Sequence, residues 1–199
     1  MWKQGIIQNY KCHRHLFALQ NLFFLLDVAI KVENAAALHA YDNNNGPHIA
    51  IDGNREGGMF HSDCTKGFPW LELNLSEPRN VSGVLIVNRR GGQGHRLKNL
   101  EIRAGRNPQS EETKEVRLSN NPKFGSFEGP GKDNVMYAIE FDEVVAVQYI
   151  TLQLVGKECF NVHEVTVFGV QGMFIFKMFN LAFLVLNSKL YIVKTKNKR

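Results

Sequence analysis

The chain has 199 residues, of which 44% are hydrophobic and 22% are charged, a composition typical of a globular protein with room for one ordinary domain plus extensions. The formal net charge is +5, but residues 1–31 carry +3 and residues 173–199 carry +6, so residues 32–172 carry −4. A folded nucleic-acid-binding domain carries its positive charge on the domain itself. The charge distribution therefore argues against nucleic acid as a partner.

The first 31 residues have the pattern of a leader. An apolar run from Leu16 to Leu26 follows three basic residues, as in a secretory signal peptide. Gln20 and Asn21 interrupt the run, and no clear small-x-small cleavage site follows it. We expect residues 1–31 to be a leader and the protein to be extracellular; a buried or unstructured leader is the alternative.

Residues 173–199 form an apolar and basic tail that we expect to lie outside the domain. Its apolar part, 173–193, contains Lys177 and Lys189. A transmembrane helix needs roughly 20 mostly apolar residues, and a charge near its centre costs about 2.5–3.5 kcal/mol on insertion scales. The sequence therefore predicts no transmembrane span, and the final KTKNKR does not fit a GPI signal.

Between these ends the sequence favours β-structure. Short alternating or apolar runs separated by turn-forming residues recur at 70–75, 81–88, 100–105, 114–118, 137–141, 146–155 and 163–170. No long segment has helical periodicity. The pattern is typical of an antiparallel sandwich or barrel, so we expect one all-β domain over residues 32–172, with Trp70 in its core.

The glycine-rich stretch after residue 88 joins two of these predicted strands. It reads RRGGQGHR, from Arg89 to Arg96. A loop between two strands is a hairpin connection, whereas a phosphate cradle needs a strand-to-helix turn and a motif such as GxGxxG, which the chain lacks. We expect a hairpin loop with outward-pointing arginines rather than a nucleotide site.

The chain has three cysteines, Cys12, Cys64 and Cys159. No C-x-x-C pair suggests a metal site. In a secreted protein Cys64 and Cys159 could form a disulfide across the fold; two free thiols are the alternative.

Several motifs in order resemble the F-type lectin (fucolectin) domain of the discoidin-like (F5/8 type C-like) group. The resemblance covers roughly residues 32–170 and implies a calcium-binding, fucose-recognising jelly-roll β-sandwich. The motifs are AIDGN (Ala50–Asn54), S-x-C-T (Ser62–Thr65), PW (Pro69, Trp70), NR-x5-RL (Asn88, Arg89, Arg96, Leu97), EIRAG (Glu101–Gly105) and the closing HEVTVFG.

The resemblance implies a sugar site that is only partly conserved. The family holds fucose with two arginines, which match Arg89 and Arg96, and with a histidine whose position is Lys66 here. The loop aspartate of the family falls on Gly91, and its two adjacent cysteines fall on Gly92 and Gln93. Lys66, His61 or His95 could supply the missing donor. We expect a partly degenerate site for fucosylated or related glycans.

The resemblance also implies a calcium ion as cofactor. Calcium takes six to eight oxygen ligands. The family's ligands match the side chains of Asp52 and Glu164 and the main-chain carbonyls of Ile49, Asn54, Asp63 and His163. The alternative for Asp52 is the cap of an Asp-Gly turn. Position 163 is usually a cysteine in the family, so its histidine removes the expected partner of Cys64.

Three classes of function remain to be compared. The first is a calcium-stabilised lectin, and the second is a discoidin-like adhesion or interaction domain that has lost fucose binding, as Lys66 and Gly91 suggest. An enzyme is not expected, because the chain has no HExxH motif or recognisable catalytic triad and its histidines are scattered. Homo-oligomerisation is left open.

Overall fold

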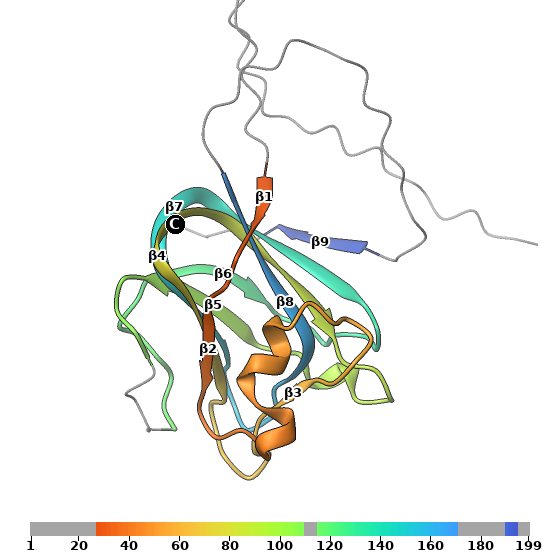
Figure 1. Ribbon diagram of the computed structural model, residues 1–199. Helices are drawn as coiled ribbons and strands as arrows, with labels where there is room; N and C mark the ends of the chain where they lie inside the picture. Colours follow the sequence, from red (N-terminus) through yellow and green to blue (C-terminus); the bar gives the residue numbers. More distant parts are fainter. Residues whose placement is uncertain (1–26, 110–114, 171–189, 195–199) are drawn as a thin grey trace, which may run out of the picture.

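The structure is a computed structural model that describes residues 27–109, 115–170 and 190–194 (Figure 1). Most of the predicted leader and tail therefore lies outside the described residues. Of the predicted leader, β1 (Asp27–Ile30) pairs with β8 (Asn161–Val170). Of the predicted tail, β9 (Leu190–Lys194) pairs in parallel with β7 (Met136–Leu154).

Two long strands, β4 (Trp70–Asn88) and β7, run antiparallel to each other along almost their whole length. Their pairing shifts register between Asn74 and Arg79 and again between Val81 and Gly83. Such irregularities bend a strand and increase its twist, so the two halves of each strand can belong to different layers. The sequence predicted each long strand as two shorter ones, divided near these bends.

The bends divide the strands into two layers. The first half of β4 and the second half of β7 lie with β2 (Asn34–Ala37), β5 (Leu100–Gly105) and β6 (Lys123–Phe127). Their other halves lie with β8 and β1, and β3 (Phe60–His61) pairs with β8. This arrangement confirms the predicted antiparallel β-sandwich.

The main core fills the space between the layers. Alternate residues of a strand point to opposite faces, and Leu71, Leu73 and Leu75 of β4 all join the main hydrophobic cluster. Val84 and Ile86 continue the core in the second half of the strand, with at most 1% of their surface exposed. Trp70 is buried as predicted, but it packs with Leu38 and Leu118 in a smaller, separate cluster.

The strand predicted at 114–118 is wrong for its described part, because residues 115–118 are not in a strand. The side chain of Gln153 accepts a hydrogen bond from Leu118 N at 2.9 Å and donates one to Val116 O at 2.9 Å. These bonds satisfy backbone groups that a neighbouring strand would otherwise pair with. The segment thus covers Trp70 as an irregular loop.

Helical structure in the described residues is limited to three short 3-10 turns, η1 (Asn43–Asn45), η2 (Pro47–Ile51) and η3 (Gly94–Arg96). None of the helices described has the length and hydrophobicity needed to cross a membrane.

Cys64 and Cys159 form a disulfide across 95 residues of sequence. It joins the loop after β3 to the segment that enters β8. Next to it, Ser62 N donates to Phe160 O at 2.9 Å and Phe160 N donates to Ser62 Oγ at 2.8 Å. The disulfide thus fixes one end of the sandwich. The sequence left open whether Cys64 and Cys159 form a disulfide or remain free thiols, and the structure shows the disulfide.

Removing this disulfide should destabilise the fold. A cross-link over a loop of this length restricts the unfolded chain, and losing a native disulfide typically costs about 2–5 kcal/mol. We expect a Cys64→Ser, Cys159→Ser variant to lose that much unfolding free energy in urea titrations. Reductant should lower the stability of the wild type and leave the double variant unchanged; an equally stable variant would contradict the pairing.

Candidate functional site

The predicted site residues gather mainly in loops at one end of the sandwich, the lower end in Figure 1. The turns η1 and η2, the segment that follows η2, β3 and the loop that follows β4 all lie there (Figure 1). Several hydrogen bonds and one ion pair connect them, as described below. These loops therefore form one continuous polar end of the sandwich, next to the hydrophobic core.

The loop after β4 crosses between the two layers. β5 is hydrogen-bonded to β6 and β7, while the end of β4 is hydrogen-bonded to β7 and β8. The predicted hairpin is therefore wrong: β4 and β5 are successive in sequence but not neighbours in the sheet. Alternation along a strand shows which residues face the core but does not show which strand lies beside it.

Buried Asn88 fixes both ends of this loop. Its side-chain amide donates to Gly94 O and to Lys132 O, each at 2.9 Å, and its side-chain oxygen accepts from Arg89 N at 2.9 Å. With 1% of its surface exposed, this side chain exchanges no bonds with bulk water. The direction in which the chain leaves β4 at Arg89 is thus set from inside the domain.

A single carboxylate holds the glycine-rich part of the loop. Asp133 accepts hydrogen bonds from Gly92 N, at 2.5 Å, and from Gly94 N. Gly91 and Gly92 have φ angles of +85° and +87°, which residues with a side chain rarely adopt. At Gly94 a Cβ atom would lie 2.5 Å from Asp133 N, so only glycine allows this close approach. The glycines are therefore required by the loop's shape.

His61, Arg89 and Arg96 form a cationic cluster. Arg89 Nη1 donates to Asn161 Oδ1 at 3.2 Å, and Asn161 lies opposite His61 in the pairing of β3 with β8. Arg96 lies near enough to lower the pKa of Arg89, although burial is the larger cause. Burial also lowers the pKa of His61, and both arginines add to that effect. We call these three residues the cationic cluster.

Tyr41 borders the cationic cluster and was not singled out from the sequence. Its ring centroid lies 5.0 Å from that of His61, and 64% of its surface is exposed. Its backbone N donates to His61 O at 2.8 Å. The next residue, Asp42, caps η1 by accepting from Asn44 N and raises the pKa of His61 slightly against the larger opposing effects. The exposed ring therefore offers apolar contact area beside these polar groups.

Two of the predicted sugar-site residues have other neighbours. Lys66 Nζ lies 3.6 Å from Glu115 Oε1, and the Glu115 carboxylate also accepts from Gly67 N at 2.9 Å. His95 is exposed in η3 and lies near enough to Glu158 to lower the pKa of that carboxyl. Within the described residues, the histidine brought next to the two arginines is His61.

The predicted calcium residues bring two carboxylates together. Asp52 follows η2 and accepts from Asn54 N at 2.7 Å, while Glu164 on β8 accepts from Gly53 N at 3.1 Å. Only 6% of the Glu164 surface is exposed. Burial raises the pKa of Glu164 to about 7, and the nearby carboxylate of Asp52 contributes to the rise. A cation between these two groups would relieve that electrostatic cost.

The residues whose main-chain carbonyls are predicted to bind calcium lie in η2, just after η2, just after β3 and on β8. The register of β8 shifts by one residue at His163, since Val87 pairs with Glu164 and Asn88 pairs with Val162. Such a bulge takes a residue out of the regular ladder. Asn54 O and Asp63 O accept bonds from Gly57 N at 3.4 Å and Lys66 N at 3.3 Å. Ile49 lies within η2.

Side chains alone do not make a metal cluster here. In the described ranges, no three His, Cys, Asp or Glu side chains gather closely enough to hold a metal ion. The predicted set has only two side-chain ligands, with carbonyls for the remainder. Such a set suits a hard cation such as calcium rather than a transition metal.

The segment after η2 and the start of the glycine-rich loop are joined through His163 and Arg90. His163 donates from Nδ1 to Gly58 O at 2.7 Å and accepts from Arg90 N at 3.3 Å through Nε2. Arg90 also pairs with Glu56 at 2.5 Å and donates to Arg55 O at 3.2 Å. Movement of the segment after η2 would therefore be transmitted to the start of the glycine-rich loop.

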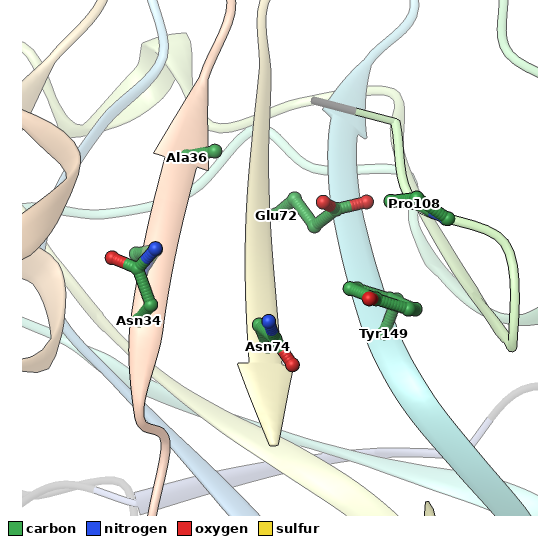
Figure 2. A pocket seen from close by; sticks show the side chains of 7 residues that line it. Asn34, Ala36, Glu72, Asn74, Pro108 and Tyr149 are labelled. Atoms are coloured by element: carbon green, nitrogen blue, oxygen red, sulfur yellow. The ribbon is translucent and has the colours of Figure 1, made fainter. Parts of the chain in front are cut away.

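A separate shallow pocket lies on the face formed by β2, β4 and β7 (Figure 2). Figure 2 shows Asn34 and Ala36 on β2, Glu72 and Asn74 on β4, Tyr149 on β7, and Pro108 on a loop. Its volume of about 150 Å³ is below the roughly 300–1,000 Å³ of ordinary ligand pockets. None of the predicted site residues lines it.

Comparison with known proteins matches most of the described chain to one family. The model of the F5/8 type C domain matches residues 32–165. A fucolectin from Anguilla anguilla is 35% identical over 60 residues, an alignment that covers 28% of this chain and 38% of the relative.

Solved structures of lectins share the fold. A fucolectin from Morone saxatilis serum superimposes with a TM-score of 0.60 and 27% identity, over 70% of this chain and 47% of that one. A fucose binding module of Streptococcus pneumoniae superimposes with a TM-score of 0.56 and 22% identity, over 77% of this chain and 99% of that one. This chain thus spans less than half the length of either fish lectin.

The cationic cluster predicts how His61 titrates. Because Arg89 and Arg96 lower the pKa of His61, Arg89→Ala and Arg96→Ala should each raise it, and Asp42→Asn should lower it further. The imidazole signals in an NMR titration measure this directly. Arg79→Ala, which removes an exposed arginine paired with Glu77, is the matched control and should leave the pKa unchanged. If the pKa of His61 were the same in both arginine variants as in the wild type, the cationic cluster would be contradicted.

Proposed function

Because the chain belongs to the F5/8 type C domain family, we propose that it is a secreted lectin-type module that binds fucosylated or related glycans and catalyses no reaction. The observation that carries the proposal is the cationic cluster of His61, Arg89 and Arg96 in the loops at one end of the sandwich. The lectin relatives support it, and the Cys64–Cys159 disulfide supports an oxidising, extracellular location.

Each member of the cluster has a separate role in this proposal. A planar guanidinium can donate to two neighbouring oxygens of a sugar at once. Arg89 is oriented for this by its bond to Asn161 and is partly buried, and Arg96, in η3, lies near enough to act on it electrostatically. His61 donates from Nδ1 to Ser62 O at 2.7 Å, so in the neutral ring Nε2 is left as an acceptor for a hydroxyl. Donors and one acceptor then converge on the sugar.

Tyr41 supplies the apolar contact. A monosaccharide has one face of C–H groups that packs against an aromatic ring. Tyr41 is exposed and lies against His61, so its ring can cover a sugar held by the arginines. In this chain it takes the place of the adjacent cysteines that the resemblance implied for residues 92 and 93.

We include a structural calcium ion in the proposal, because the donor set fits it. Asp52 and Glu164 would bind through carboxylates, and Ile49, Asn54, Asp63 and His163 through carbonyl oxygens. Burial and the neighbouring Asp52 raise the pKa of Glu164, and a cation bound beside the two carboxylates would stabilise their charged forms. An ion there would hold the segment after η2 and, through His163 and Arg90, the start of the glycine-rich loop. It would stabilise the site without contacting the sugar.

The second candidate function is an interaction domain without sugar binding. The observation that favours it is the ion pair between Lys66 and Glu115. Lys66 occupies the position of the family's sugar-binding histidine, and this ion pair directs it to Glu115 rather than to the cationic cluster. The experiment below separates the two candidates, since only the lectin requires the arginines for binding glycan.

Arg89→Ala and Arg96→Ala should each weaken binding to fucosylated glycans. Each guanidinium supplies charge-assisted hydrogen bonds worth about 1.5–3 kcal/mol, so the affinity should fall by at least about tenfold. A glycan array followed by calorimetry measures this, with circular dichroism to verify the fold. Arg79→Ala should bind as the wild type does. Unchanged binding in both site variants would exclude this site, and no binding by the wild type would favour the interaction domain.

Chelation should lower the melting temperature. A ligand present at 100 times its Kd that binds only the folded state stabilises it by about 2.7 kcal/mol. We therefore expect thermal unfolding at a lower temperature in EDTA than in millimolar calcium. Glu164→Gln should remove the difference, and Glu143→Gln, which neutralises an exposed carboxylate on β7, should retain it. Equal melting temperatures of the wild type in EDTA and in calcium would contradict the calcium site.

A further inference from the structure

Two segments of β4 have the sequence that directs N-linked glycosylation. This modification uses the motif Asn-x-Ser/Thr, in which x is not proline. Residues 74–76 read NLS and residues 80–82 read NVS, so Asn74 and Asn80 are both candidate acceptors. A glycan is bulky and hydrophilic, so the asparagine that carries it must lie on the surface of the folded domain. The structure separates the two candidates by this criterion.

Asn74 lies within the face of a sheet, between two neighbouring strands. It pairs with Asn34 of β2 on one side and with Tyr149 of β7 on the other. Its side-chain oxygen accepts a hydrogen bond from Ser76 N at 2.8 Å, and the half-buried residue lines the shallow pocket shown in Figure 2. A glycan attached to Asn74 would have to leave through this pocket, between the side chains of both neighbouring strands. We therefore expect folded chains to carry no glycan there.

Asn80 lies at the bend of β4, at the end of an exposed stretch that begins at Ser76. Its main chain is held in place, since it pairs with Ala146 of β7 and its carbonyl oxygen would lie 2.0 Å from a Cβ atom at Gly169. The next residue, Val81, is buried in the main core, and successive side chains of a strand point to opposite faces. The exposed side chain of Asn80 is thus directed outward from a fixed backbone, which suits a glycan acceptor.

The bend is at the upper end of the domain in Figure 1, opposite to the loops that carry the cationic cluster. The glycine-rich loop begins after Asn88, and from Asn80 to Asn88 an extended strand measures about 26 Å. A glycan on Asn80 therefore leaves the cationic cluster accessible. The same glycan would shield Val144, which is 37% exposed and lies two residues from Ala146, the partner of Asn80.

We propose that Asn80 carries an N-linked glycan and that Asn74 does not. In this modification Asn80 Nδ2 loses one proton and forms a bond to C1 of the first N-acetylglucosamine of a lipid-linked oligosaccharide. The bond between C1 and the lipid diphosphate breaks, and the lipid diphosphate leaves with the electron pair. The inference rests on the secretion included in the proposed function, because the transfer takes place in the secretory pathway.

Ser82 supplies the hydroxyl group that the motif requires. In the folded domain Ser82 Oγ donates to Asp27 Oδ1 at 2.7 Å, which connects it to β1. The hydroxyl is open to the glycosylating enzyme only before β1 is in place, so attachment precedes completion of the fold. Ser82→Ala removes the motif while keeping Asn80, and the matched Ser82→Thr keeps both.

Secretion of the full chain from a eukaryotic cell line, followed by mass spectrometry of the secreted protein, tests the proposal. We expect most secreted chains to carry one glycan that peptide N-glycosidase removes. Because enzymatic release converts the carrier asparagine to aspartate, peptide mapping identifies its position. The glycan should be lost in Asn80→Gln and in Ser82→Ala, and it should be retained in Ser82→Thr and in the matched Asn74→Gln. Asn80→Gln should leave the affinity for fucosylated glycans unchanged.

The outcomes separate this inference from the proposed function. A secreted chain that carries its glycan at Asn80 alone supports both the modification and the extracellular location. A secreted chain without a glycan, or with a glycan at Asn74, overturns the inference and leaves the extracellular location intact. A wild-type chain that never enters the secretory pathway overturns the location and the modification together.

Discussion

The pairing of β4 with β7 determines where every other part of the domain lies. Because both strands bend at the same two register shifts, they pass through both layers of the sandwich and bury the core between their own halves. The end of β4 then reaches the loop end of the domain at Asn88, whose buried side chain fixes the start of the glycine-rich loop. The position of Arg89 is thus a consequence of strand pairing as much as of the loop's own sequence.

The segment after η2 and the glycine-rich loop are connected because polar side chains bridge them. His163 contacts both Gly58 O and Arg90 N, and the ion pair between Arg90 and Glu56 adds a second connection. The buried Glu164 follows His163 directly on β8. A cation held there would act on the glycine-rich loop through the side chains of His163 and Arg90, so it would support the shape of that loop without touching a ligand.

Alternation of apolar residues was sufficient to predict an antiparallel sandwich or barrel and the buried Trp70, since burial on one face leaves a period of two in the sequence. The choice of a sandwich came from the family resemblance. It could not predict that β4 and β5 are not neighbours, or that Gln153 replaces a strand at 115–118, because these depend on contacts distant in sequence. The same limit applies to the site. Arg89 and Arg96 were identified from their motif, whereas the roles of Tyr41 and Asp133 require the three-dimensional arrangement.

The two hydrogen bonds that Asp133 accepts, which we call the Asp133 clamp, determine which residues of this loop can be substituted. Asp133 accepts hydrogen bonds from the main-chain N–H groups of residues 92 and 94, so the loop's shape depends on no cross-link within it. Gln93 lies between the two gripped residues, and its side chain takes no part in the clamp. Position 93 should therefore tolerate substitution. Evolution or a randomised library can change its side chain, and so the surface of the loop, without changing the backbone conformation.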